Sequence, residues 1–330
     1  MDNHYFFVGI DVSKDELVIA VGDNQVISFK NTACGVSRLV DRINSVCGDL
    51  EPWFVMESSG AYSTRPATQL VGNHDVQVSI VNPGRVKAHG KASGIRSKTD
   101  AEDAKLIHSY AIKHQDKLHP WQPTPDSFRK LKDLVDQAEF FHNQINRIRN
   151  RMHAQDFMEC DRTIAKANNS VIRQIERQIS KLEIQMDELV AGDEMLDTQI
   201  QLMRTIPGIA QNSARKILAM TRGMITERTP AALTAFAGLA PAQRQSGSSL
   251  NGHSYIDKQG CASLRKILYM CSLSGAEFNP ALKPFYQRLI TRKNNQLTKK
   301  QARVAVMRKL LLIIRAILVS GKPFNPDLHC

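Results

Sequence analysis

Short apolar runs alternate with helix-like segments over the first 81 residues, and this alternation limits the fold more than any other feature. Each run has the length and the β-branched or aromatic content of a strand. We expect strands at 5–10, 16–21, 25–30, 53–57 and 75–81, and helices near 35–47 and 62–72. Three strands followed by alternating helices and strands predict an α/β domain.

Acidic residues close two of these predicted strands. Asp11 follows the run 5–10, and Glu57 follows the run 53–56. Asp100 and Asp103 come later, at the start of a helix-like segment. Because strand ends converge at one edge of a sheet, we expect the four carboxylates to meet there and to repel one another unless divalent cations bind. Two such cations can stabilise the attacking and leaving oxygens of a phosphodiester, so the pattern predicts a metal-dependent phosphoryl-transfer site.

The second acidic pair has an ordinary structural explanation as well. Thr99 is a good N-cap and Glu102 stands three residues later, which predicts a capping box and a helix running to about 114. Asp100 and Asp103 then share a helix face, but acidic residues in a first turn also stabilise the helix dipole. Only the presence of Asp11 and Glu57 in the same sequence favours a functional role for this pair.

The composition favours a soluble protein that binds polyanions. The 330 residues suffice for two or three domains, and 44 Lys and Arg against 32 Asp and Glu give a formal charge of +12. The six cysteines are scattered without a C-x-x-C pair, which indicates neither a zinc site nor a disulfide framework. No apolar run approaches ~20 residues and no basic stretch precedes an apolar one at the N-terminus, so we expect a cytoplasmic protein without a membrane span.

Two segments are expected to connect domains. The stretch 84–99 carries six basic residues and three glycines, and we expect a mobile connection that lies along a phosphate backbone. The proline-rich stretch 119–125 is expected to end the first domain.

Two heptad seams follow, which predict a pair of antiparallel helices. The seams consist of Leu131, Leu134, Ala138, Phe141, Ile145, Ile148 and Met152, and of Val171, Ile175, Ile179, Leu182, Met186 and Leu189. We expect the arginines at 147, 149, 151, 173 and 177 to be exposed, toward solvent or nucleic acid. The pair is either a structural spacer or a dimerisation arm.

Three features of the C-terminal part have both a structural and a functional explanation. Residues 203–218 resemble a helix-hairpin-helix, whose turn can bind a phosphate, although Ala210 replaces the usual second glycine. In the polar loop 245–252, Ser246 is either a turn residue or a nucleophile whose missing histidine base a metal site could replace. The basic run 291–303 before an apolar helix at 304–319 either binds phosphates or is a solvated flank.

Taken together, these motifs resemble the DEDD transposases and recombinases of bacterial insertion sequences, the family called insertion sequence one-ten, which includes the pilin-gene invertases. The resemblance covers nearly the whole chain. It rests on residues 9–14 (GIDVSK), 57–62 (ESSGAY), 82–83 (NP), 98–104 (KTDAEDA), 206–209 (IPGI), 237–241 (AGLAP) and 246–249 (SGSS). Ser59 replaces the threonine common in the glutamate motif, which is a mild chemical change.

The resemblance implies a fold of class α/β plus α. Residues 1–118 would form a RuvC-like, RNase H-like catalytic domain, 126–195 a coiled coil, and 199–330 a helical transposase domain. Asp11, Glu57, Asp100 and Asp103 would bind Mg²⁺, and Ser246 would attack the scissile phosphate to form a covalent protein–DNA intermediate.

The resemblance also implies partners, and it leaves alternatives. Donor and target double-stranded DNA would be held by a homo-oligomer, a dimer or a tetramer, and a structured noncoding bridge RNA would pair with both DNAs. A pilin-type DNA invertase without a guide RNA is one alternative. A hydrolytic RuvC-like junction nuclease would need the carboxylates but no serine, and a nonenzymatic nucleic-acid-binding module would need neither.

Overall fold

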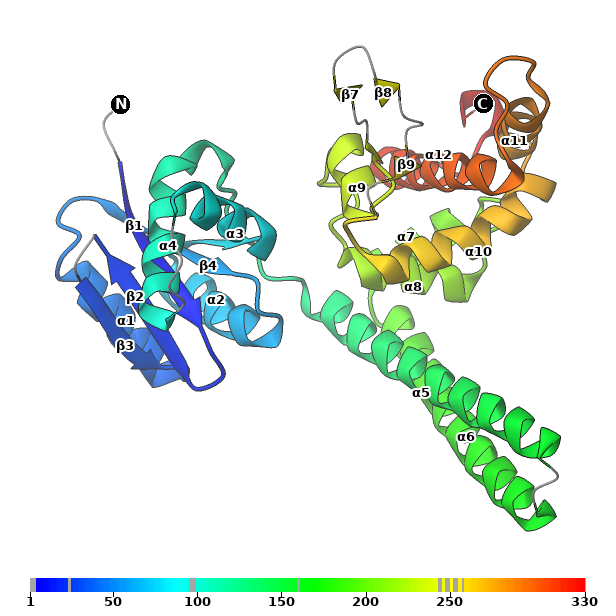
Figure 1. Ribbon diagram of the computed structural model, residues 1–330, viewed down its shortest axis with the longest axis horizontal. Coiled ribbons are helices and arrows are strands. Elements are labelled where there is room, and N and C mark those ends of the chain that lie inside the picture. The colour runs from blue at the N-terminus through cyan, green and yellow to red at the C-terminus, as the bar shows by residue number, and fades with distance from the viewer. Residues whose placement is uncertain are drawn as a thin grey trace. The chain divides into compact units, whose positions relative to one another are not determined.

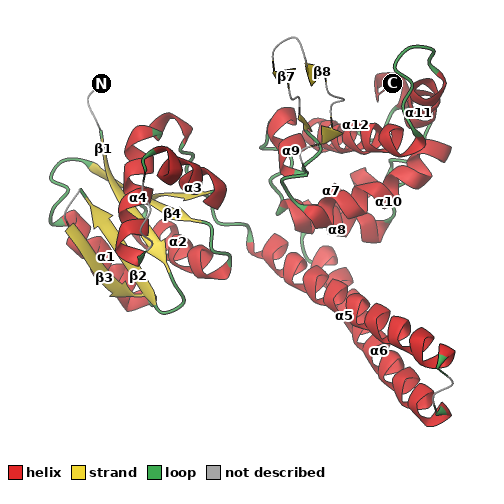
Figure 2. Cartoon of the chain, in the orientation of Figure 1, coloured by secondary structure: helices red, strands yellow, loops and turns green. Residues whose placement is uncertain are grey.

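The computed structural model describes residues 4–22, 25–94, 99–158, 161–242, 245–246, 250–251, 255–256 and 258–329. For residues 242, 245, 246, 250, 251, 255 and 329 it describes the backbone alone. The chain divides into two compact units, residues 1–123 and 124–330. The first contains a sheet and the second is almost entirely helical (Figures 1 and 2).

A five-stranded sheet in the order β3-β2-β1-β4-β5 forms the centre of the first unit. Its strands are β1 (Tyr5–Val12), β2 (Glu16–Val21), β3 (Gln25–Lys30), β4 (Glu51–Glu57) and β5 (Gln77–Val81). The first three strands form antiparallel pairs, and β4 and β5 continue the sheet in parallel with β1. The predicted strands are therefore confirmed, and the strands β1, β4 and β5 end at the same edge.

Helices cover both faces of this sheet. The helices α1 (Ala33–Asn44) and α2 (Ala61–His74) pack on one face, against side chains such as Val8, Ile10 and Phe54. The helices α3 (Pro83–Ala92) and α4 (Asp100–Lys113), with the short 3₁₀ helix η1 (Gln115–Lys117), lie on the other side. There Leu106, Ile107 and Tyr110 of α4 pack against Phe7, Trp53 and Val55. Because side chains alternate along a strand, Gly9 and Asp11 of β1 also face α4.

The expectation of a mobile connection at 84–99 is wrong for residues 84–92, which belong to α3. Asn82 caps this helix, since its side chain accepts a hydrogen bond from the Gly84 N–H (2.7 Å), and Pro83 occupies the first turn, where no N–H is needed. Gly90 serves packing, because a Cβ there would lie 2.9 Å from a methyl group of Leu106. Residues 95–98 of the expected connection lie outside the described residues.

Two long helices, α5 (Asp126–Phe157) and α6 (Arg162–Ala191), begin the second unit and pack along each other. All seven residues of the first predicted seam are buried or half-buried in this packing. In the second seam Val171 is wrong, since it is 47 % exposed and Ile172 is buried in its place. Starting at Ile172 restores the alternating spacing of three and four that keeps a seam on one side of a helix. The five predicted arginines are exposed, and Arg149 pairs with Glu176 across the two helices (3.1 Å).

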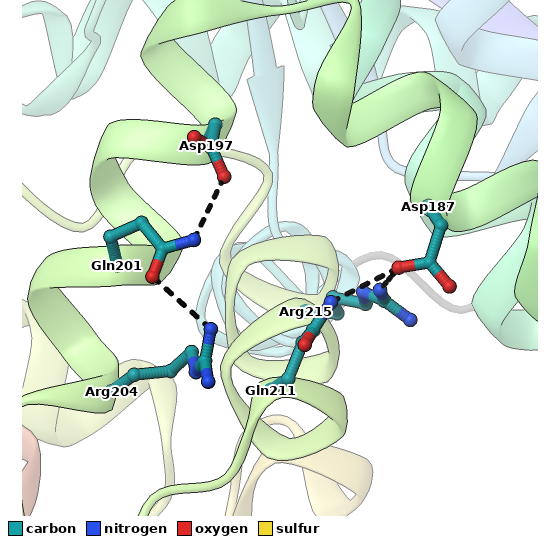
Figure 3. Close-up of polar contacts among 6 residues, drawn as sticks. All are labelled: Asp187, Asp197, Gln201, Arg204, Gln211 and Arg215. Atoms are coloured by element: carbon teal, nitrogen blue, oxygen red, sulfur yellow. Dashed lines mark hydrogen bonds and ion pairs between the residues drawn. The ribbon is translucent and has the colours of Figure 1, made fainter.

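The remaining helices pack around one core that also includes the near ends of α5 and α6. They are α7 (Glu194–Arg204), α8 (Gln211–Thr221), α9 (Pro230–Phe236), α10 (Ala262–Phe278), α11 (Leu282–Thr291), α12 (Lys299–Ser320) and α13 (Pro326–His329). Asp187 of α6 accepts hydrogen bonds from Gln211 and from the buried Arg215 of α8 (Figure 3). On α7, Gln201 bridges Asp197 and Arg204 (Figure 3). The contacts of Asp187 fix the base of the helical pair to α8.

The turn between α7 and α8 is packed against α10. Gly208 has a φ of 105°, and a Cβ there would lie 2.9 Å from the backbone nitrogen of Gly275. The Asn279 side chain donates a hydrogen bond to the Pro207 carbonyl (3.1 Å). The glycine that suggested a phosphate-binding turn is therefore explained by close backbone packing, while the phosphate contact stays a prediction. In the described residues no helix has both the length and the apolar character that a membrane span requires.

Candidate active site

Gly9 brings α4 close to β1, and this contact positions the acidic residues. A Cβ on Gly9 would lie 2.4 Å from the His108 nitrogen and 2.5 Å from the Ala104 carbonyl oxygen. Both atoms belong to the backbone of α4, so no side-chain movement could make room for it. The first turn of α4, which ends at Asp103, therefore begins beside the part of β1 that follows Gly9. Asp11 lies two residues after Gly9 and on the same face of the sheet.

Asp11 and Glu57 stand at neighbouring positions on parallel strands. The register pairs Ile10 with Met56, and the two acidic residues are the next residue on each strand. Side chains at such positions point to the same face of the sheet, and this is the face that α4 covers. Both residues are half-buried. The strand register therefore places these two residues side by side.

The other two acidic residues lie in the first turn of α4. Thr99 caps the helix, since its hydroxyl accepts a hydrogen bond from the Glu102 N–H (3.2 Å). The Glu102 carboxylate lies 3.5 Å from the Lys105 ammonium group. Asp100 is exposed and Asp103 is half-buried, one helical turn apart. The predicted helix and its Thr99 N-cap are thus confirmed, but only one half of the predicted capping box is seen, because the Glu102 side chain contacts Lys105 instead.

The other three carboxylates are close enough to influence Asp11. The pKa of Asp11 rises from 3.8 to about 6 because the carboxyl is partly buried and because Asp103, Asp100 and Glu57 repel its negative charge. One backbone hydrogen bond from Val12 opposes this rise. The structure therefore brings together the four acidic residues that the sequence singled out, in an arrangement that disfavours full ionisation.

This donor set fits a hard divalent cation, although the side chains are not arranged around one. Within the described ranges no three His, Cys, Asp or Glu side chains are close enough to act as ligands of one ion. Carboxylate oxygens are what Mg²⁺ prefers. A cation between them would offset both the burial of the Asp11 carboxylate and the repulsion by its neighbours, which together raise its pKa. The chemistry of the donors therefore fits, and the side chains would have to draw together.

Ser246 lies in the second unit, on a small hairpin between α9 and α10. The strand β7 (Gln245–Ser246) pairs with β8 (Leu250–Asn251), and β6 (Pro241–Ala242) pairs with β9 (Tyr255–Ile256). Ser246 stands opposite Leu250, so the expectation of an irregular loop is wrong at this residue. Its side chain and residues 247–249 lie outside what the structure describes.

The base of this hairpin is held by close backbone contacts. The Cys261 N–H donates to the Phe236 carbonyl (2.8 Å), and a Cβ on Gly260 would lie 2.4 Å from that same oxygen. Arg265 of α10 donates a hydrogen bond to the Ala237 carbonyl (3.0 Å). These contacts join the two chain segments that enter and leave the hairpin.

Gly9 is the residue of the site that the sequence analysis missed. A glycine inside a strand marks a close approach of another backbone, and this signal was present in the run 5–10. The pattern could not say which segment approaches, because α4 lies almost a hundred residues later.

Comparison with known proteins agrees with this geometry. A family model described as transposase, of the DEDD type of IS110, matches residues 8–155, and a model of the transposase IS116/IS110/IS902 family matches residues 200–287. The pilin gene-inverting proteins of Moraxella lacunata and Moraxella bovis are each 31 % identical to the chain over 98 % of both sequences. The chain belongs to the IS110 family of transposases. The resemblance seen in the sequence is thus confirmed.

A further relative is an uncharacterised protein of the insertion element IS110 from Streptomyces coelicolor. It is 24 % identical over 46 % of this chain and 36 % of its own length. The acidic quartet lies in the span of the first family model, and Ser246 lies in the span of the second. This IS110-family transposase is a DNA-recombining enzyme, with a mixed α/β N-terminal part and a helical remainder.

Proposed function

We propose that this transposase cuts and rejoins DNA at one site built from the acidic quartet, a divalent metal ion and Ser246. The raised pKa of Asp11 supports the metal part of the proposal, because a partly buried carboxylate with three acidic neighbours gains from a nearby cation. Mg²⁺ bound there would stabilise negative charge on the phosphate oxygens. Asp11 and Glu57 would hold it from the sheet, and Asp100 and Asp103 from α4.

Ser246 would act as the nucleophile. Its Oγ forms a bond to phosphorus while the bond from phosphorus to the leaving DNA oxygen breaks. The serine loses its proton and the leaving oxygen gains one, so proton and bond counts balance and no ATP is needed. Attack by a hydroxyl of another strand on the phosphoserine then reverses the step and joins new ends. The family resemblance at residues 246–249 supports this role.

We further propose that residues 1–118 form a RuvC-like domain, 126–195 a coiled coil and 199–330 the transposase domain of a homo-oligomer. A bridge RNA would select donor and target DNA by base pairing, while the protein binds backbone and shape. The net charge of +12 supports a polyanionic partner of either kind.

DNA inversion without a guide RNA is the second candidate function. It is supported by the full-length similarity to two proteins named for inverting a pilin gene. Sequencing the RNA that copurifies with the protein, and treating the complex with ribonuclease, separates the two. A discrete structured RNA whose removal abolishes recombination supports guidance, and full activity of RNA-free protein supports unguided inversion.

The mechanism is tested with a suicide DNA substrate that traps a protein–DNA adduct. We expect a covalent adduct in Mg²⁺ with the wild type, and none after chelation or in the Ser246→Ala variant. A hydrolytic nuclease would instead cut without an adduct and would tolerate the loss of the serine. Cutting by Ser246→Ala at the wild-type rate would refute the serine mechanism.

A further inference from the structure

A second polar site lies at the same edge of the sheet as the acidic quartet but on the opposite face. It is a cavity of ≈ 640 Å³ between the β1–β2 turn, the start of α1 and the start of α2. Its size falls in the range of small-molecule pockets, which is about 300–1,000 Å³. Lys14 lines it three residues after Asp11, and Tyr62 lines it five residues after Glu57. A strand that crosses this edge of the sheet would therefore meet both sites.

The cations of this cavity form no salt bridge among the described residues. Lys14, Lys30 and Arg65 line it and are exposed, and in the described part of the chain none of the three forms an ion pair. Asp15 and Glu16 also line it, so the lining carries three positive and two negative charges, a net of +1. Three unpaired cations around a cavity attract an anion with several oxygens.

Two helix N-termini add to this attraction. Thr32, the N-cap of α1, lines the cavity, as does Ala61 in the first turn of α2. The N-cap of α2 is Gly60, which offers no side chain to the first amides of the helix. Such amides favour a phosphate, but here they only reinforce the cations.

Asn31 forms a buried link between the walls of the cavity. It is 5 % exposed, and its amide nitrogen donates to the Ser13 carbonyl (2.9 Å) and to the Tyr62 carbonyl (3.4 Å). Its Oδ1 has no hydrogen-bond partner among the described residues. An unpaired buried acceptor is unfavourable. Because this oxygen is itself covered, a sugar or base would donate to it only after the cavity wall shifts, and the new bond would then break no existing one. The link also holds the two walls before any ligand binds.

Tyr62 supplies an aromatic surface beside these polar groups. It is 47 % exposed, so its ring is accessible to a stacking partner. A ring, three cations and an orphan acceptor match the base, the phosphate and the donors of one nucleotide. Bases stack on aromatic rings without regard to sequence.

We propose that this cavity binds one nucleotide of a single strand, with its phosphate on Lys14, Lys30 and Arg65 and its base on Tyr62. This rests on the proposed function, since it places the strand next to the acidic quartet. DNA and RNA share the chemistry, and the strand bound here would be either the one being cut or one that pairs with it.

Photo-crosslinking tests the site without any catalysis. Short single-stranded DNA and RNA oligonucleotides carrying 5-iodouracil are irradiated with the full-length protein in EDTA, and the adduct is mapped by mass spectrometry. We expect a crosslink to Tyr62 with at least one of the two strands, and the strand that reacts identifies the ligand. Crosslinks that map only to other residues would overturn the proposal.

Matched variants measure the contribution of each group by fluorescence anisotropy with the same oligonucleotides. We expect Tyr62→Ala to weaken binding about tenfold and Tyr62→Phe to retain it, since both aromatic rings can stack. The double variant Lys30→Ala/Arg65→Ala should lower the salt slope by about 0.7, for one phosphate of a single strand that is no longer neutralised. Arg42→Ala, at the opposite end of α1, is the control for charge alone.

The outcome is independent of the catalytic mechanism. A double variant that binds like Arg42→Ala, with the same melting temperature, would refute the phosphate site. If instead Asp11→Asn recombined normally, the metal mechanism would fail while the Tyr62 crosslink in EDTA persisted. If no crosslink to Tyr62 formed but recombination still required Asp11, the nucleotide-binding proposal for the cavity would be refuted and the metal mechanism would stand.

Discussion

The acidic quartet and Ser246 are held by very different structures. Asp11 and Glu57 lie on strands of eight and seven residues within a five-stranded sheet, and Gly9 fixes the approach of α4. Ser246 lies on a strand of two residues whose partner also has two. Strand register, the packing of α4 on Gly9 and the Thr99 cap therefore place the carboxylates, whereas a short hairpin carries the serine.

This difference matches the rigidity that each catalytic group requires. Charges that repel one another need a rigid frame, because a flexible one would let them separate before a metal binds. A nucleophile that must reach a phosphate, and later release it, needs less restraint. We therefore expect substitutions of the quartet carboxylates to remove catalysis. Substitutions that disturb the sheet and α4 around them should also change the free energy of unfolding, whereas substitutions in the hairpin should not.

The largest effect is expected from neutralising the quartet. Asp11→Asn, Glu57→Gln, Asp100→Asn and Asp103→Asn should each lower recombination at least ~1,000-fold, the equivalent of ~4 kcal/mol of lost transition-state stabilisation. The fold and the affinity for nucleic acid should be largely kept, as measured by circular dichroism and gel shift. Two of these variants recombining near the wild-type rate would contradict the role of the site.

The serine variants are expected to show that adduct formation depends on Ser246 and not on the neighbouring serines. Ser246→Ala should lower the covalent adduct at least ~100-fold, since no other hydroxyl replaces a positioned nucleophile. Ser248→Ala and Ser249→Ala, at positions outside the described residues, should retain adduct and serve as controls. An adduct in Ser246→Ala that maps to another residue would transfer the role to it.

The sequence predicted the first region better than the second for a physical reason. Alternation along β1 and β4 follows from burial on two faces, so strands and their terminal carboxylates were readable. The segment around Gly90 was misread because a glycine packed on Leu106 and a glycine in a loop look alike in one sequence. Ser246 could be singled out only through family resemblance, since no local base or spacing marks it.

Gly9→Ala tests whether packing really positions the quartet. The new methyl group would meet the backbone of α4 at 2.4–2.5 Å, so α4 must shift. We expect a loss of about 3 kcal/mol in the free energy of unfolding, together with reduced recombination. Gly72→Ala, an open position in α2 with no atom within 4 Å, should instead stabilise by about 0.4–1 kcal/mol. Equal urea midpoints for the two variants would contradict this account.

Mixing inactive subunits tests whether one subunit's serine acts with its partner's quartet. We predict that it does, because a proline-rich stretch and two long helices separate the two regions in the chain. Asp11→Ala and Ser246→Ala subunits then form heterodimers with one doubly inactive site and one intact site. Random exchange should restore about a quarter of the wild-type cleavage. No recovery despite proven exchange would mean that each site is built within one chain.

The smallest effect concerns the stability of the metal-free protein. The pKa of Asp11 in the folded state, about 6, lies above its ordinary value of 3.8. The folded protein therefore holds this proton more tightly, and the resulting stabilisation is complete below pH 3.8 and is lost as the pH rises through 6. Asn cannot ionise, so Asp11→Asn should be more stable than the wild type at pH 7.5 in EDTA. The difference should be about 1 kcal/mol, since Asp11 is only half-buried, and it should vanish near pH 4. Urea unfolding at both pH values measures this difference, with the exposed Asp41→Asn as control.

Added Mg²⁺ gives a second test of the same variant. Because a ligand that binds only the folded state stabilises it, Mg²⁺ should stabilise the wild type and reduce the difference in the free energy of unfolding. If the difference in the free energy of unfolding changed with neither pH nor Mg²⁺, the ionisation of Asp11 among the quartet would not control the stability of this region.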